Sequence, residues 1–245
     1  MKKLVRTPIL LFFSLFQPII FLLLFTQLFS SVGTTFAAAG GYAGASYLSF
    51  ATPGIVLQNG FSSALQSGTS VVDDLTSGFL EKELVTPVNR AAILLGRLLT
   101  DAFRVVVQSA IIIILAYLLG AEIQAGVAGV VLIFILVAFF GLAWSGISLT
   151  IGLKTKSAET VFGLGGILTF PLLFMSTALV PVKLMPTWMQ NVSQVNPISY
   201  TVDAVRALTL TGFDWAKILE AFGVIGVIAV VTLGATLYLF RKVVS

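Results

Sequence analysis

The sequence predicts an all-α polytopic membrane protein with six transmembrane helices in one domain. Of its 245 residues, 58% are hydrophobic and only 10% are charged, whereas a soluble domain carries roughly 25% charged residues. Apolar runs of about 20 residues, the length that crosses a bilayer, recur along the chain. The predicted spans are residues 8–29, 48–70, 99–119, 126–152, 159–180 and 218–240.

The first predicted span follows a basic start and precedes a run of small residues, Phe36 to Gly40, as a signal peptide with its cleavage site would. A signal peptide has an apolar region of about 7 to 15 residues. The stretch from Pro8 to Phe29 is 22 residues long. Its length therefore favours a transmembrane helix over a cleaved signal.

The second predicted span is the most polar of the six. Pro53 lies inside it, together with amide and hydroxyl side chains. Such a helix either packs among other helices through polar contacts or faces a transport pathway, and the sequence leaves both readings open. The polar residues of this span are Gln58, Asn59, Ser62, Ser63, Gln66 and Ser67.

The basic residues indicate the orientation. Cytoplasmic loops of membrane proteins carry an excess of Lys and Arg. With the N-terminus inside, eleven of the fourteen basic residues fall on the cytoplasmic side, and only Lys183, Arg206 and Lys217 fall outside. An even number of spans then places both termini in the cytoplasm. The net charge of +4 is modest, and a membrane location explains it without a nucleic-acid partner.

A polar segment between the second and third spans, residues 71–97, is a candidate docking loop. It concentrates charges of both signs, Gly78 permits a sharp turn, and Pro87 ends a short amphipathic helix. This helix offers a soluble partner an apolar knob and orienting charges; the alternative is a solvated loop. The candidate docking residues are Asp73, Asp74, Gly78, Phe79, Leu80, Glu81, Lys82, Pro87 and Arg90.

The segment after the fifth span, residues 181–211, predicts short helices at the outer face. Pro186 starts one helix, and the pair Asn196-Pro197 ends it before a second. In the second helix, Asp203 and Arg206 are spaced to pair at i, i+3. The helices lie at the outer membrane interface, dip into the protein as re-entrant helices, or form a lid in solvent. The candidate outer-gate residues are Pro186, Trp188, Asn196, Pro197, Asp203 and Arg206.

Several kinds of chemistry are excluded by composition. The chain has no Cys and no His, which removes thiolate nucleophiles, imidazole bases and the usual zinc ligands. It contains no Gly-Lys dipeptide, so a phosphate-binding loop is absent. Asp101 and Arg104 are placed near the cytoplasmic end of the third span, so no span has a charge at its centre, which disfavours an ion-driven transporter. We expect no catalytic residue, bound metal or cofactor.

Three stretches together resemble the type-2 ABC exporter permeases, the group of daunorubicin-resistance permeases and O-antigen exporters. In the stretch from Asp74 to Arg97, the docking loop has the order of residue types found in these permeases: an acidic residue, Gly, Leu, Thr-Pro, Arg and Gly-Arg. The N-terminal span and the stretch from Pro186 to Leu208 match in the same order. Family members commonly begin with an interfacial helix. Only six residues precede Thr7, so either the start lies upstream or this helix is lacking.

The resemblance implies a half-transporter in a prokaryotic cell membrane. Two permease chains, as a homodimer or a related heterodimer, would each dock on a cytoplasmic ABC ATPase, which uses the ATP and Mg²⁺. ATP-driven closure of the ATPases would pass through the docking loop and switch the pathway from inward to outward.

The expected substrate is hydrophobic or amphiphilic: a drug, an antibiotic or a lipid-linked molecule. Soft walls with scattered polar groups suit such a molecule, although lipid contact is the alternative for each aromatic. A glycan exporter of the same family, an ion-driven transporter and a non-transporting scaffold remain alternatives. The candidate pathway residues are Gln58, Asn59, Ser62, Gln66, Phe170, Phe174 and Met175.

Overall fold

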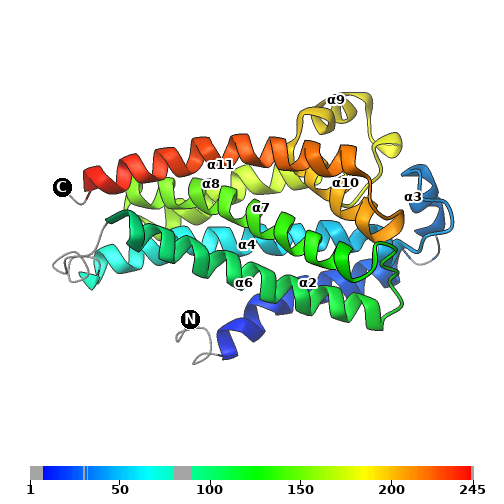
Figure 1. Cartoon of the computed structure of the whole chain (residues 1–245), viewed down its shortest axis with the longest axis horizontal. Coiled ribbons are helices and arrows are strands. Elements are labelled where there is room, and N and C mark those ends of the chain that lie inside the picture. The colour runs from blue at the N-terminus through cyan, green and yellow to red at the C-terminus, as the bar shows by residue number, and fades with distance from the viewer. Residues whose placement is uncertain (1–7, 30, 32, 80–89, 244–245) are drawn as a thin grey trace.

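The computed structural model describes residues 8–29, 31, 33–79 and 90–243, and all regular structure among them is helical. Long helices lie side by side, and short helices cluster at one end of them (Figure 1). The long helices are α2 (Pro8–Leu28), α4 (Tyr47–Thr76), α6 (Arg90–Leu118), α7 (Gly126–Thr155), α8 (Ala158–Phe174) and α11 (Trp215–Val243). The short ones are α3 (Gly33–Ala39), the 3₁₀ helix η1 (Val182–Leu184), α9 (Thr187–Val195) and α10 (Pro197–Leu210).

Three helices in the described part of the chain are long and apolar enough to cross a membrane: Ala92–Leu118, Gly126–Thr155 and Trp215–Phe240. Residues Leu15–Leu28 and Gly33–Ala39 form a pair bent by 99°, which would be a fourth span. α4 is long enough to cross a membrane, but its polar side chains make it less apolar than these three helices. α8 is apolar but has only 17 residues. The protein is thus an all-helical, multi-pass membrane protein, and the crossings by α4 and α8 stay a prediction.

Three helices differ in extent from the predicted spans by six residues or more. α4 continues to Thr76 instead of ending at residue 70. α6 begins at Arg90 rather than at residue 99, so Asp101 and Arg104 lie well inside the helix and not near its cytoplasmic end. α8 ends at Phe174, whereas the predicted span continued to residue 180. The chain beyond α8 is apolar enough to continue a helix, and its departure depends on contacts with α4 and α10 described below.

α4 is the central helix, packing against α2, α6, α7, α8 and α10. Its small residues let neighbours approach: a Cβ added at Gly68 would lie 2.5 Å from the carbonyl oxygen of Ser148 on α7. Nearby, the Ser148 hydroxyl donates to the carbonyl of Leu65 at 3.2 Å. Small residues and interhelical hydrogen bonds are what hold helices together in a membrane, where lipid weakens any hydrophobic drive.

α7 and α11 join in the same way. The Thr232 hydroxyl of α11 donates to the carbonyl of Ala143 at 2.9 Å, and the Thr236 hydroxyl donates to the carbonyl of Gly146 at 2.8 Å. These threonines, one turn apart, bind the backbone of a helix that is almost entirely apolar. The bundle therefore combines a buried apolar core with polar contacts between its helices.

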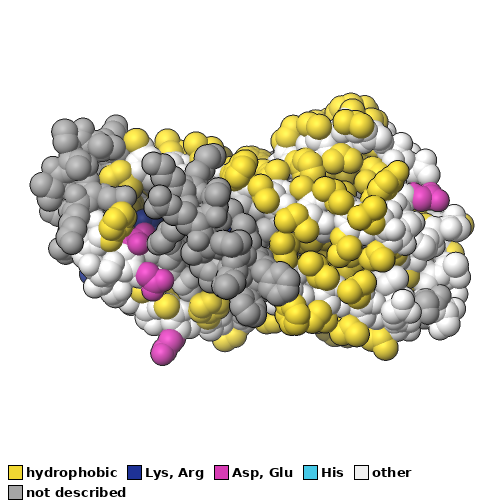
Figure 2. Space-filling view, turned by 90° about the horizontal axis from the view of Figure 1, so that it is seen from below, with side chains coloured by type: hydrophobic (Ala, Val, Ile, Leu, Met, Phe, Trp, Pro, Cys, Tyr) yellow, Lys and Arg dark blue, Asp and Glu magenta, His cyan; other side chains and the backbone are white. Residues whose placement is uncertain are grey.

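The outer surface of the bundle supports its assignment as a membrane protein. Hydrophobic side chains cover much of the right-hand half of the face in Figure 2, and acidic side chains lie mainly toward the left-hand end. Large apolar residues are also exposed on several helices, including Leu24 of α2, Ile114 of α6 and Val230 of α11. Such an extended apolar surface matches contact with lipid.

The two candidate segments lie at opposite ends of the bundle. The end of α4, the start of α6 and the C-terminus of the chain are at one end, and α3, α9 and α10 are at the other (Figure 1). This arrangement is compatible with the predicted sidedness, in which the docking loop and the termini share the cytoplasmic face.

Candidate functional site

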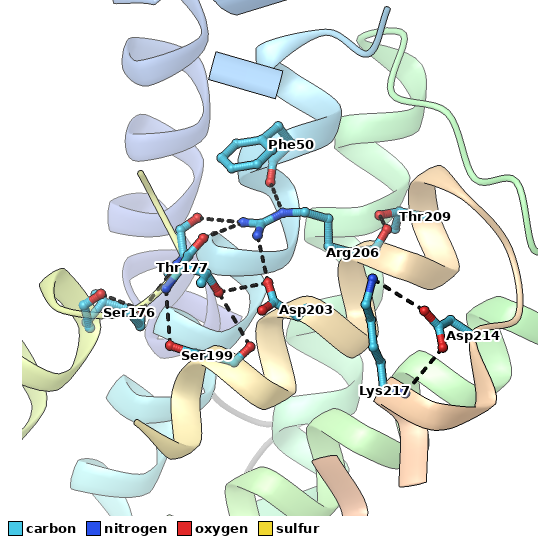
Figure 3. A network of polar contacts seen from close by, with 11 residues as sticks. Phe50, Ser176, Thr177, Ser199, Asp203, Arg206, Thr209, Asp214 and Lys217 are labelled. Atoms are coloured by element: carbon cyan, nitrogen blue, oxygen red, sulfur yellow. Dashed lines mark hydrogen bonds and ion pairs between the residues drawn. The ribbon is translucent and has the colours of Figure 1, made fainter. Parts of the chain in front are cut away.

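A buried arginine organises the end of the bundle that carries the short helices. The side chain of Arg206, on α10, is 2% exposed and contacts two segments far from it in the sequence (Figure 3). Its Nε donates to the carbonyl of Phe50 at 3.1 Å, and its Nη2 donates to the carbonyls of Thr177 at 2.6 Å and Ala178 at 3.2 Å. Its carbon Cζ also lies 3.9 Å from the centre of the Phe50 ring. Arg206 thus joins α4, α10 and the chain leaving α8.

Asp203 balances the charge of Arg206. Its Oδ1 lies 3.0 Å from Nη1 of Arg206 and also accepts a hydrogen bond from the Thr177 hydroxyl at 2.8 Å. The ion pair predicted from the i, i+3 spacing is therefore present. Because Arg206 is buried, α10 dips into the protein and is not a lid in solvent.

The chain between α8 and η1 can reach this network because α4 has a glycine there. A Cβ on Gly54 would lie 2.5 Å from the carbonyl oxygen of Ala178, so a larger residue would push the segment away. The irregular backbone at residues 175–181 leaves carbonyls without helical partners, and a buried carbonyl needs a donor. Arg206 supplies it for two of them, which explains why α8 ends before the predicted span.

The remaining outer-gate candidates mark helix boundaries. Asn196 accepts from the backbone N–H of Ile198 at 3.0 Å as the N-cap of α10, and its Nδ2 donates to the carbonyl of Leu172 at 2.6 Å. Pro197 is the first residue of α10, and Pro186 directly precedes α9. Trp188, on α9, is 56% exposed. The structure therefore unites Asn196, Asp203 and Arg206 with the core and leaves Trp188 at the surface.

The described part of the docking loop lies at the opposite end. Gly78 has φ +67°, a left-handed conformation that favours glycine, as the predicted sharp turn requires. Phe79 is 50% exposed, and Asp73 is exposed as well. Four of the candidate docking residues lie outside the described residues: Leu80, Glu81, Lys82 and Pro87. For Arg90 the backbone alone is described.

An ion pair joins the two ends of the docking loop. Nη2 of Arg97, on α6, contacts Oδ2 of Asp74, on α4, and both side chains are more than four-fifths buried. The residues between them span the whole loop. This pair holds α4 and α6 together where the loop leaves the bundle, a link that the sequence did not predict.

Further polar contacts continue along α4 and α6. The Ser67 hydroxyl donates to Oδ2 of Asp101, and the other carboxylate oxygen, Oδ1, lies 3.4 Å from Nη2 of Arg104. Two turns higher, Nδ2 of Asn59 donates to Oε1 of Gln108 at 3.4 Å. Asn59 is thus an interhelical contact with 1% exposure, which matches the reading of α4 as polar contacts among helices.

Other polar residues of α4 face outward. Ser62 and Gln66 are exposed and Gln58 is half-buried, which matches the reading of a helix facing a pathway. The contacts of Asn59 thus support polar packing on one face of the helix, whereas a pathway along the outward face stays a prediction.

The aromatic pathway candidates belong to α8, a helix that packs against α4. Phe170 and Phe174 are exposed on α8 and stack on each other with 6.4 Å between ring centres. Met175, which follows α8, is half-buried.

Comparisons with known proteins agree with the resemblance found in the sequence. A family model described as ABC-2 type transporter matches residues 1–210. A daunorubicin resistance ABC transporter permease protein, DrrB1 of Streptomyces coeruleorubidus, is 35% identical over 201 residues, covering 82% of this chain and 69% of that protein.

More distant relatives have similar names. The putative transport permease ycf38 of Cyanophora paradoxa is 31% identical over 210 residues, covering 84% of this chain and 70% of that protein. The probable multidrug ABC transporter permease YbhR of Escherichia coli K12 is 25% identical over 177 residues, covering 71% and 46%. The predicted resemblance is therefore confirmed: this chain belongs to the ABC-2 type transporter family, as a membrane permease subunit that is not itself an ATPase.

Proposed function

We propose that the chain exports a hydrophobic or amphiphilic substrate, such as a drug, an antibiotic or a lipid-linked molecule, in a complex with a separate cytoplasmic ATPase. The family assignment supports an ATPase partner, because a permease of this family has no hydrolysis site of its own. The names of the drug-resistance and multidrug relatives support the substrate class.

The single observation that carries the docking role is the construction of the loop. Asp74 and Arg97 clamp its two ends, and Phe79 extends from its first turn with half of its surface exposed. An exposed apolar side chain beside an ion-paired base is suited to a protein interface, where buried aromatic residues carry much of the affinity. Force applied there by an ATPase would act on α4 and α6 together.

The short helices at the outer end of the bundle take part in the same transport cycle. α10 is tied to α4 by Arg206, so a tilt of α4 at the docking end is transmitted to the outer end. Two permease chains would enclose the pathway, lined in part by the exposed polar residues of α4. A glycan exporter of the same family is the second candidate, and the outward-facing polar residues Ser62 and Gln66 are the observation that favours it.

The test is a mild-detergent purification of the chain from its native membrane, with mass spectrometry of associated proteins and an ATPase assay. We expect a stoichiometric nucleotide-binding subunit with activity in the eluate. The Phe79→Ala variant should lose most of this subunit while the permease still elutes as a folded species.

Phe213→Ala is the matched control, because Phe213 is 45% exposed and follows α10 at the other end of the bundle. It should retain the ATPase. An ATPase that stays bound to Phe79→Ala as it does to wild type would refute the docking role. A chain that elutes alone from several detergents would refute the proposed complex and favour an ion-driven transporter or a scaffold.

A further inference from the structure

A stripe of polar side chains faces outward on α4 and meets a cation on α6. Gln58, Ser62 and Gln66 follow one another at four-residue spacing, which places them on one face of the helix. Nη1 of Arg104 donates to Oε1 of Gln66 at 2.9 Å. The Arg104 side chain is 20% exposed, so the guanidinium is accessible from outside the helix pair.

The predicted crossing of α6 would place this cation at membrane depth. Arg104 is within the candidate span Ala92–Leu118, about 18 Å from its start at a rise of 1.5 Å per residue. Lipid is a poor surrounding for a guanidinium, and ionisable residues at this depth generally mark pathways or partners. An adjoining face of the same helix, roughly 100° to 140° around it from Arg104, exposes large apolar side chains: Leu99 by 65% and Phe103 by 47%. A charged group beside an apolar surface matches the two ends of an amphiphile.

The charges around Arg104 leave part of it available. The carboxylate of Asp101 lies 3.4 Å from Nη2, but Asp101 is buried and also accepts from Ser67, which fixes it on the inner side of the helix pair. The next arginine along the helix, Arg97, is engaged by Asp74. The other N–H groups of Arg104 have no hydrogen-bond partner among the described residues. Within the described part of the chain, an incoming anion therefore meets donors that the fold has oriented without using them all.

We propose that Arg104, oriented by Gln66 and Asp101, binds the anionic headgroup of an amphiphile, a phosphate or a carboxylate, while the apolar tail lies along the surface of Leu99 and Phe103. A guanidinium suits both headgroups, because its planar fork donates parallel hydrogen bonds to two oxygens of one group. As a substrate site this rests on the proposed export function, although the binding itself does not need the ATPase.

The test is native mass spectrometry of the purified chain in a nonionic detergent. The probes are dioleoyl phosphatidic acid and dioleoyl phosphatidylcholine, which share their tails and differ in headgroup. We expect the wild-type chain to bind phosphatidic acid about tenfold more tightly, the effect of one or two charge-assisted hydrogen bonds. Arg104→Gln should abolish this preference, and Arg104→Lys, which keeps the charge without the fork, should retain part of it.

Lys154→Gln is the matched control, because it removes an exposed cation at the end of α7 and should leave the preference unchanged. If Arg104→Gln fails to elute as a folded species, Gln66→Leu provides the test, and a weaker preference is expected there too. The proposal is overturned if wild type shows no preference, if Arg104→Gln keeps it, or if Lys154→Gln loses it equally. Inorganic phosphate competing as strongly as phosphatidic acid would also overturn it, since the tail would then contribute nothing. Loss of ATPase association leaves this readout untouched.

Discussion

At the residue scale, Arg206 is the most constrained side chain of the described structure. It is almost fully buried, yet the carbonyls of Phe50, Thr177 and Ala178 and the carboxylate of Asp203 surround it. A buried cation is costly to bring out of water, and it is tolerated only when such partners replace the water it has lost. Its role is to bind irregular backbone that no helix satisfies.

Replacing Arg206 by Met should destabilise the protein strongly. The change removes the donor of several buried acceptors and leaves Asp203 without its counter-ion, so we expect a loss of about 3–5 kcal/mol, measured by thermal unfolding in detergent. Lys217→Met is the control, since it breaks an i, i+3 pair with Asp214 whose side chains are 41% and 36% exposed and should cost about 0–1 kcal/mol. Equal shifts for both variants would contradict the assignment.

The glycines of α4 give a second prediction at this scale. Gly68→Ala should lower the unfolding temperature, because its Cβ would collide with the backbone of Ser148 and force α4 away from α7. Gly234→Ala on α11 meets nothing within 4 Å and should be neutral or stabilising, by up to about 1 kcal/mol from helix propensity. Thermal unfolding of both variants side by side checks this, and a tolerated Gly68→Ala would show that the two helices separate easily.

At the element scale, α4 and α6 behave as one hairpin around the docking loop. Polar contacts join them from Asn59–Gln108 through Ser67–Asp101 to Asp74–Arg97. Polar contacts between helices are favourable in a membrane because the alternative partner is lipid. A hairpin linked in this way would transmit motion of the loop along its whole length.

Reversing the charges of the Asp74–Arg97 pair tests this role. Asp74→Arg or Arg97→Asp alone places like charges together at the base of the loop, and we expect several-fold less ATPase to co-purify. The double variant restores an ion pair in which the two charges have exchanged places. It should recover most of the association with the ATPase. Recovery would distinguish a clamp from a direct contact with the ATPase, because a direct contact would be lost in the double variant as well.

At the scale of the whole molecule, the number of crossings decides the topology. Length and composition support three spans, or four with the bent pair, whereas the predicted scheme needs α4 and α8 to cross as well. Both are close-packed: α4 lies at the centre of the bundle and α8 packs against α4 and α7. A helix shielded by others can be polar or short and still cross, since lipid does not contact all of it.

Cysteine labelling tests these crossings directly, since the chain has no cysteine of its own. Single cysteines replace exposed residues on either side of α4, at Ala43 and Ser77, and on either side of α8, at Lys156 and Asn191. In intact cells a membrane-impermeant maleimide should label Ala43→Cys and Asn191→Cys, whereas the other two should react only after lysis. Labelling of both members of a pair from the same side would remove that helix from the list of spans.

The sequence by itself determined the class of protein, the family and the positions of the main segments. Composition alone requires a membrane, since the chain carries too few charges for a soluble domain. The short-range features, such as the turn at Gly78, the start of α10 at Pro197 and the pair Asp203–Arg206, follow from residues a few positions apart. Their physics is local, so their spacing was sufficient.

Only the tertiary structure decided where α8 stops, where Asp101 and Arg104 lie along α6, and which atoms Arg206 binds. The acceptor on Phe50 is 156 residues from Arg206 in the chain, and a backbone carbonyl looks the same in every residue of a sequence. Likewise, Asp74 and Arg97 are separated by the entire docking loop, and Asn59 and Ser62 lie three positions apart but face opposite surroundings. Tertiary packing determines which of these residues come into contact, and a hydropathy pattern holds no information about such contacts.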